Sequence, residues 1–249
     1  MRKVIVYIPT AGYRPYVQMQ EAYQNAKNYL FSVARDLEFR EYYCKVFPIH
    51  ANRNCCVGHS IEGFVEEDGS RWFPDTTIWI DADTVIPYDA LYRLLEPDKQ
   101  IVVGIYRLKR YPFHPLIFDR WKYDEETQMW VYLPNVNHPK AGLFPCDSAG
   151  MGCARVDVEV LKALDPPHFQ YQTPSKLEGP SYKGRDMFVT HPGIEFLIKW
   201  HVYTNTEEAW FWRKVVDAGF EIWADPKINC KHMTEVAVDD EYAERYGGE

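Results

Sequence analysis

The sequence has no long uninterrupted hydrophobic run, no signal-peptide pattern and no excess of positive charge. Its apolar stretches are much shorter than the roughly 20 residues that span a bilayer, and its N-terminus lacks the charged-then-apolar order of a secretory leader. The 28 Lys and Arg residues against 36 Asp and Glu residues give a formal net charge of −8. A basic phosphate-binding surface is therefore not expected. We expect a cytoplasmic protein without a membrane span, for which nucleic acid is not the favoured partner.

Cysteine pairs typical of metal sites or redox motifs are also lacking. None of the six cysteines belongs to a Cys-x-x-Cys pair, and two of them, Cys55 and Cys56, are adjacent. Adjacent cysteines suit neither a zinc site nor an ordinary disulfide. We expect reduced thiols that pack as small apolar side chains.

Strand-like and helix-like segments alternate over the first 106 residues. The patterns predict strands at 3–9, 42–49, 76–80 and 101–106, and helices at 16–35, about 52–66 and after Pro87. This alternation indicates an α/β fold with a mixed, mainly parallel sheet flanked by helices. Further along, the patterns predict a small antiparallel insertion at 109–145, a Gly-containing turn and short helix at 147–164, a helix at 207–218 and a strand at 220–224.

Two carboxylates follow the apolar run 76–80 directly. Asp81 and Asp83 flank Ala82, and residues two apart in an extended chain point to the same side. Open α/β sheets bind ligands at the carboxyl ends of their strands, and paired carboxylates there suit Mg²⁺ or Mn²⁺ on a diphosphate. The alternative is a solvated turn or a helix cap, where Asp is common.

The Asp-x-Asp motif after an apolar strand resembles two families. One comprises the nucleotide-sugar glycosyltransferases of GT-A fold, in which this motif holds a divalent ion on the donor diphosphate. The other comprises haloacid-dehalogenase-like phosphatases, in which Asp81 would be the nucleophile. That nucleophile normally lies on the first strand, whereas about 80 residues precede Asp83 here. The position in the chain therefore favours the GT-A resemblance and its Rossmann-like fold.

Other segments extend the resemblance to GT-A enzymes in chain order. The end of the first strand, at Pro9, Thr10 and Ala11, corresponds to the nucleoside contact of those enzymes, and Arg53-Asn54 is similar to the Arg-Asn of their second helix. Asp147 and Gly150 lie in a segment resembling the Gly-rich turn that faces donor sugar and acceptor. As a bare pattern, such a turn is equally common without any function.

Two late segments resemble the catalytic half of these enzymes. Glu207 and Glu208 are similar to the acidic helix start of the inverting family 2 transferases, in which an acidic residue deprotonates the acceptor hydroxyl. Acidic residues in a first helical turn are otherwise ordinary partners of the helix dipole, and the sequence does not choose between the two glutamates. His232 resembles the late histidine that supplies a third metal ligand beside the Asp-x-Asp motif in several GT-A enzymes. The alternative is an ordinary surface or hydrogen-bonded histidine.

The resemblance implies one GT-A catalytic domain over residues 1–249, with a nucleotide-binding half at 1–106 and an acceptor-binding half at 107–249. It implies a glycosyltransferase that uses Mn²⁺ or Mg²⁺ and a nucleoside diphosphate sugar. The reaction inverts the configuration if a glutamate is the base, whereas some GT-A families with a metal-binding histidine retain it. The hydroxyl acceptor stays open among a glycan, a lipid carrier, a protein or a small molecule. A dehalogenase-like phosphohydrolase and a non-catalytic sugar-binding module are the alternatives. Some of the rings in 109–192, Phe169 among them, are candidates for stacking on the acceptor, although core packing is their default role.

Overall fold

The structure is a computed structural model that describes residues 1–10, 14–109, 113–124, 129–170, 206–234 and 237–238. For 120–124, 129–133 and 237–238 it describes the course of the backbone alone. The helices are α1 (Val17–Val33), α2 (Ile49–Glu62), α3 (Ala90–Leu95), α4 (Val158–Lys162) and α6 (Glu207–Asp217). The strands are β1 (Arg2–Pro9), β2 (Leu37–Cys44), β3 (Phe64–Val65), β4 (Arg71–Trp72), β5 (Thr76–Ile80), β6 (Thr84–Val85), β7 (Ile101–Ile105), β8 (Ile117–Asp124), β9 (Met129–Pro134), β10 (Phe144–Cys146), β11 (Ser148–Ala149), β12 (Cys153–Asp157), β13 (Ile222–Asn229), β14 (Lys231–Met233) and β15 (Ala237–Val238). Among the described residues, no helix is long and apolar enough to cross a membrane.

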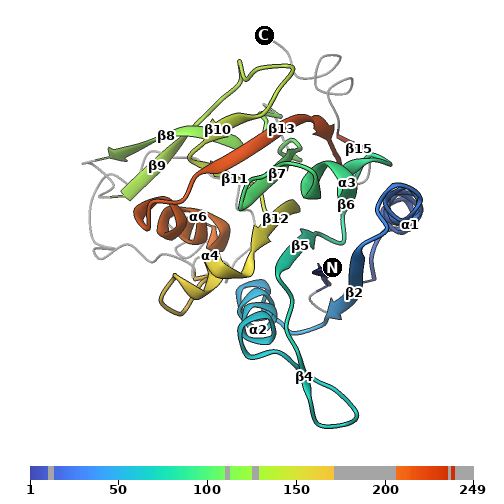
Figure 1. Ribbon diagram of the computed structural model, residues 1–249. Coiled ribbons are helices and arrows are strands. Elements are labelled where there is room, and N and C mark those ends of the chain that lie inside the picture. Colours follow the sequence, from blue (N-terminus) through green and yellow to red (C-terminus); the bar gives the residue numbers. More distant parts are fainter. Residues whose placement is uncertain (11–13, 110–112, 125–128, 171–205, 235–236, 239–249) are drawn as a thin grey trace, which may run out of the picture.

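A seven-stranded sheet in the order β10, β13, β7, β12, β5, β1, β2 forms the centre of the protein (Figure 1). Parallel pairing joins β2 to β1, β1 to β5, and β7 to β13. β12 runs antiparallel between β5 and β7, and β10 runs antiparallel to β13. Five of the seven strands therefore share one direction, which confirms the predicted Rossmann-like α/β fold with a mainly parallel sheet.

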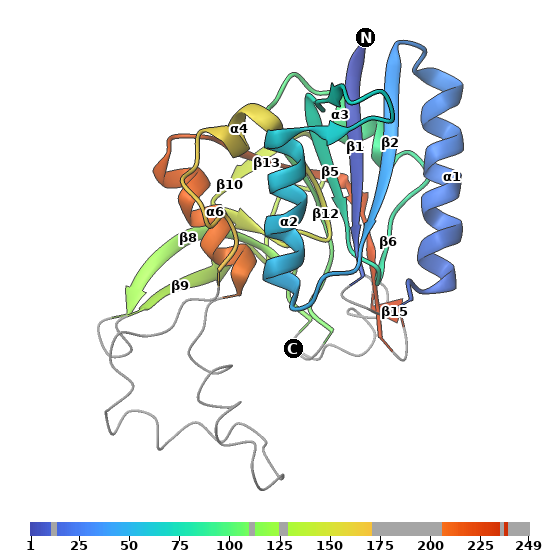
Figure 2. The same ribbon diagram turned by 90° about the horizontal axis from the view of Figure 1, so that it is seen from below.

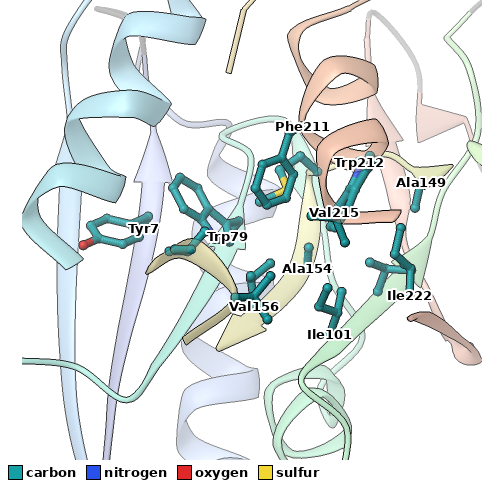
Figure 3. Packing of buried hydrophobic residues seen from close by; sticks show 14 of the residues in the cluster. Tyr7, Trp79, Ile101, Ala149, Ala154, Val156, Phe211, Trp212, Val215 and Ile222 are labelled. Carbon is teal, nitrogen blue, oxygen red and sulfur yellow. The ribbon is translucent and has the colours of Figure 1, made fainter. Parts of the chain in front are cut away.

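The alternation of side chains along the strands divides the core into two clusters. Tyr7 of β1 belongs to the cluster beneath α2, α4 and α6, whereas its neighbour Val6 belongs to the cluster beneath α1 and α3. Figure 2 shows α1 and α2 on opposite sides of β1 and β2. Phe211, Trp212 and Val215 anchor α6 in the first cluster, where each is fully buried (Figure 3). This packing fixes the orientation of the first turn of α6, which carries Glu207 and Glu208.

Several predicted elements are confirmed and others are displaced. The antiparallel insertion is present as the β8–β9 hairpin, extended by β11. Helix α6 begins after Thr206, whose hydroxyl accepts a hydrogen bond from the N–H of Ala209, and Gly219 follows its end with φ of 85°. The strand predicted at 42–49 is wrong in its bounds, because β2 lies at 37–44 and α2 already begins at residue 49. β2 is an edge strand with mostly half-buried polar and apolar side chains, so it lacks the apolar run that marks a buried strand.

The turn-and-helix prediction for 147–164 missed a central strand. Cys153–Asp157 forms β12, between β5 and β7, and only the short helix α4 follows it. The strand contains Arg155, which is buried because its guanidinium donates to the carbonyl oxygens of Leu94 and Pro97 and pairs with Asp157. A charged residue satisfied in this way obscures the apolar pattern of a buried strand.

Gly104 tests the packing of the sheet. A Cβ at this position in β7 would lie 2.6 Å from Cγ2 of Ile228 and 3.0 Å from Sγ of Cys153. We expect Gly104→Ala to lower the free energy of unfolding by about 1–3 kcal/mol, because overpacking a close-packed core is costly. Urea denaturation measures the change. The matched control is Gly58→Ala in α2, where a Cβ meets nothing within 4 Å and should be neutral or stabilise by up to ~1 kcal/mol. Equal stabilities of the two variants would contradict the close approach of Ile228 and Cys153 to Gly104.

Candidate active site

A cavity of about 570 Å³ lies where the chain leaves β1 and β5 and enters α2 and α6. It gathers most of the predicted donor-side residues and both glutamates at the carboxyl ends of parallel strands, where open α/β sheets bind ligands. Its lining consists of Pro9, Thr10, Arg14, Tyr16, Ile49, Arg53, Asp81, Ala82, Asp83, Glu207 and Glu208.

Arg53 is the centre of this cavity. One guanidinium nitrogen, Nη1, lies 2.6 Å from Oε1 of Glu207 and 2.9 Å from Oε1 of Glu208. The other, Nη2, lies 3.0 Å and 3.1 Å from the two carboxylate oxygens of Asp81. The Arg53 side chain is only 2% exposed. Although burial opposes its charge, the three carboxylates raise the pKa of Arg53 well above its usual value, so it stays a fixed cation.

The Asp-x-Asp segment is a tightly held turn. Its three carbonyl oxygens accept hydrogen bonds from three different segments: Asp81 from the N–H of Thr84, Ala82 from the N–H of Tyr16, and Asp83 from the N–H of Met233. Because 81–83 forms a turn rather than a continuing strand, the two carboxylates face different partners. Asp81 faces Arg53, whereas Asp83 faces Lys109 and His232.

His232 is held beside Asp83 in one orientation. Its Nδ1 lies 2.8 Å from the carbonyl oxygen of Arg107, which can only accept, so the proton resides on Nδ1. Its Nε2 lies 3.8 Å from Oδ1 of Asp83. Burial lowers the pKa of His232 below its usual value, against the opposing effect of Asp83. The Nε2 lone pair of a neutral imidazole therefore faces the same region as the Asp83 carboxylate.

The two glutamates differ in their access to the cavity. The side chain of Glu207 is 7% exposed, whereas that of Glu208 is 21% exposed. The backbone N–H of Met151 also lies 3.4 Å from Oε1 of Glu208. Burial raises the pKa of Glu208 to about 7, helped by the charges of Glu207 and Asp81 and opposed by Arg53. Glu208 is therefore the more accessible of the two predicted bases, and its pKa of about 7 suits proton transfer near neutral pH.

Some predicted site residues lie outside this arrangement. Asp147, Gly150 and His232 do not line the cavity, although His232 lies beside Asp83, and Ala11 is outside the described residues. Gly150 and Gly152 are needed for packing: a Cβ would lie 2.2 Å and 2.8 Å, respectively, from the hydroxyl oxygen of Tyr106. This part of the predicted turn thus makes a close approach to an internal tyrosine.

Phe169 is one of the aromatic residues predicted as candidates for the acceptor site. Phe169 is fully buried and stacks on Phe211, with ring centroids 4.6 Å apart, so it belongs to the core.

Four residues of the site were not predicted. Arg14, Tyr16 and Ile49 line the cavity, and Lys109 pairs with Asp83. Arg14 and Tyr16 follow the predicted first strand closely, which is a usable signal. The approach of Lys109 depends on a contact across 26 residues, and no local pattern reports it.

The site offers few side-chain donors to a divalent ion. Across the described ranges, no group of three or more His, Cys, Asp and Glu side chains is arranged to hold a metal. Both oxygens of Asp81, one of the predicted ligands, lie against Arg53. Asp83 and Nε2 of His232 remain as two suitable donors, and carboxylate with imidazole suits Mn²⁺ better than Mg²⁺. Two donors are compatible with an ion only if substrate and water supply its other ligands.

The raised pKa of Glu208 predicts a pH-dependent stability. Because the folded pKa of about 7 exceeds the ordinary glutamate value of 4.5, the folded state binds more protons than the unfolded state between these values. Glu208 therefore contributes up to ~3 kcal/mol to the free energy of unfolding. The contribution is fully present below about pH 4.5 and is lost as pH rises to about 7.

Glu208→Gln should remove this component, because glutamine does not ionise. We expect the stability of the variant, relative to wild type, to be higher at pH 8 than at pH 5. Urea denaturation at both values measures it, with Glu159→Gln in the first turn of α4 as the exposed control. The same relative stability of the Glu208 variant at both pH values would contradict the raised pKa.

The fold has relatives among solved structures. The crystal structure of A197 from STIV matches with a TM-score of 0.55 and 14% sequence identity, over 97% of this chain and 92% of that chain. A crystal structure of 4-diphosphocytidyl-2C-methyl-D-erythritol synthase gives a TM-score of 0.31 and 10% identity, over 64% of this chain and 76% of that chain. No protein-family model matches the chain, and no curated protein matches it. At 14% identity, the similarity to A197 shows a shared fold.

Proposed function

We propose that the protein is a metal-dependent glycosyltransferase of GT-A type, which moves a sugar from a nucleoside diphosphate sugar to a hydroxyl acceptor. The observation that carries the proposal is the convergence, in one cavity, of the Asp-x-Asp turn with a glutamate whose pKa is about 7. The first group suits a diphosphate with its ion, and the second suits removal of a hydroxyl proton. A donor and an acceptor that meet between them would have the groups needed for transfer.

The donor diphosphate belongs at Asp83 in this proposal. Asp83 and His232 would hold Mn²⁺ or Mg²⁺, which when bound would neutralise the charge on the departing diphosphate. Lys109, which pairs with Asp83, and Arg14, which lines the cavity, supply further positive charge to the site. Pro9 and Thr10 line the same cavity, and the hydroxyl of Thr10 donates to the carbonyl oxygen of Cys44, which fixes the wall between β1 and β2.

Glu208 is the base of the proposed reaction. The acceptor hydroxyl oxygen attacks the anomeric carbon, the bond from that carbon to the diphosphate oxygen breaks, and the hydroxyl proton passes to Glu208. Attack opposite the leaving group inverts the configuration. Glu207 and Arg53 act as positioning residues, because Arg53 holds both glutamates and Asp81.

The alternative with Asp81 as a phosphatase nucleophile receives less support. Both of its carboxylate oxygens accept hydrogen bonds from Arg53, which hinders their attack on a phosphoryl group.

Donor binding tests the proposal directly. We expect calorimetric titration with a panel of nucleoside diphosphate sugars to reveal at least one that binds in an Mn²⁺-dependent manner. Asp83→Asn should weaken this binding at least ~10-fold, since a carboxylate ligand is lost, while the exposed control Asp68→Asn should not. Absence of binding by every donor, with and without Mn²⁺, would contradict the proposal. Turnover of simple phosphate esters with trapping of beryllium fluoride at Asp81 would favour the phosphohydrolase.

The base is tested by rate and pH. Glu208→Gln should lower kcat by about 10²–10⁴-fold, because general base catalysis is lost, and leave donor affinity within ~3-fold. In wild type, kcat should rise with pH and level off above about 7, as Glu208 loses its proton. Because the acceptor is unknown, the slow hydrolysis of the donor, in which water is the acceptor, measures the effect of the substitution on kcat and the pH dependence of kcat. A wild-type rate unchanged between pH 5 and 8, or a Glu208→Gln variant with full activity, would exclude Glu208 as the base.

A further inference from the structure

The two carboxylates of the Asp-x-Asp turn are neutralised by cations of very different mobility. Asp81 pairs with Arg53, which is 2% exposed and held by two further carboxylates. Asp83 pairs with Lys109, whose Nζ lies 2.5 Å from Oδ2 and whose side chain is 35% exposed. A half-exposed lysine on a flexible four-carbon stem can change partners, whereas a buried arginine fixed by three acids cannot. The cation of Asp83 is therefore the exchangeable one.

We infer that Lys109 is a displaceable cation, which holds Asp83 until a divalent ion arrives and then pairs with the donor diphosphate. This inference rests on the proposed function, since it concerns the same site. A cation against one oxygen of a carboxylate repels a second cation at that carboxylate. Lys109 must therefore withdraw before Asp83 can become a full metal ligand.

The surroundings of Asp83 allow this exchange with little other movement. The carbonyl oxygen of Asp83 accepts from the N–H of Met233, at 2.7 Å, and Nδ1 of His232 is fixed on the carbonyl oxygen of Arg107. The backbone of Asp83 and the ring of His232 thus keep their places while the lysine side chain moves. A released ammonium beside the ion site would lie near the two anionic groups of a diphosphate, to which a lysine binds as a point charge.

The inference predicts opposite effects of one substitution on two ligands. In titration calorimetry with Mn²⁺ alone, Lys109→Met should bind about tenfold more tightly than wild type, because the competing charge is gone. With inorganic pyrophosphate in the presence of saturating Mn²⁺, the same variant should bind several-fold more weakly. Lys109→Arg keeps the charge and should bind Mn²⁺ like wild type. If Lys109→Met fails to fold by circular dichroism, Lys109→Gln replaces it.

Lys27→Met is the matched control. Lys27 forms a comparably exposed ion pair with Glu41, at 2.7 Å, and this pair includes no residue of the candidate site. Its loss should change neither titration. A general effect of net charge would instead move Lys27→Met and Lys109→Met together, and this would overturn the inference.

The remaining outcomes separate the inference from the proposed function. If wild type binds Mn²⁺, Asp83→Asn abolishes this binding and Lys109→Met binds no more tightly than wild type, the displaceable cation is overturned and the metal site stands. If neither wild type nor Lys109→Met binds Mn²⁺ in a way that depends on Asp83, the proposed metal site fails and the inference fails with it.

Discussion

The candidate site depends on one buried guanidinium. Arg53 joins three segments that are distant in the sequence: its own helix α2, the turn after β5 and the first turn of α6. A buried carboxylate without a partner is costly, and removing one member of a buried ion pair typically costs about 3–5 kcal/mol. The distance between the Asp-x-Asp turn and the glutamates is therefore fixed by the same interaction that makes their burial possible. The packing of α2 and α6 on one face of the sheet positions these charges.

Charge in the site is balanced only in part. Arg53 contributes one positive charge against the three carboxylates of Asp81, Glu207 and Glu208. The excess negative charge, together with burial, raises the pKa of Glu208. Under the proposed function, the distribution of charge within the site explains how a chain of net charge −8 would handle an anionic donor. A bound ion at Asp83 and His232, with Lys109 beside it, would supply positive charge at one end of the cavity, while excess negative charge at the other end would prepare the base.

The sequence predicts the sheet, and it predicts that Asp81, Asp83, Glu207 and Glu208 are site residues, because both features leave local patterns. Apolar runs mark β1, β5 and β7, and the capping threonine and Gly219 mark the bounds of α6. It does not predict β12, whose Arg155 is satisfied by distant carbonyl groups, or the edge strand β2 with its polar pattern. The sequence likewise identifies residues of the site but does not predict which of them pair. That Asp81 pairs with Arg53, and that Lys109 reaches Asp83, depends on contacts across 28 and 26 residues, which only the folded chain brings together.

One buried cation, Arg53, holds the candidate site together, and the stability of Arg53→Met at two pH values tests this most directly. Without the guanidinium, three buried carboxylates face each other, and protonation relieves their repulsion. We predict a loss of unfolding free energy of at least ~3 kcal/mol at pH 8 and a much smaller loss at pH 5. The exposed pair of Arg213 with Asp217 provides the control, since Arg213→Met should cost no more than ~1 kcal/mol. A loss for Arg53→Met that is below ~1 kcal/mol, or equal at both pH values, would contradict the account.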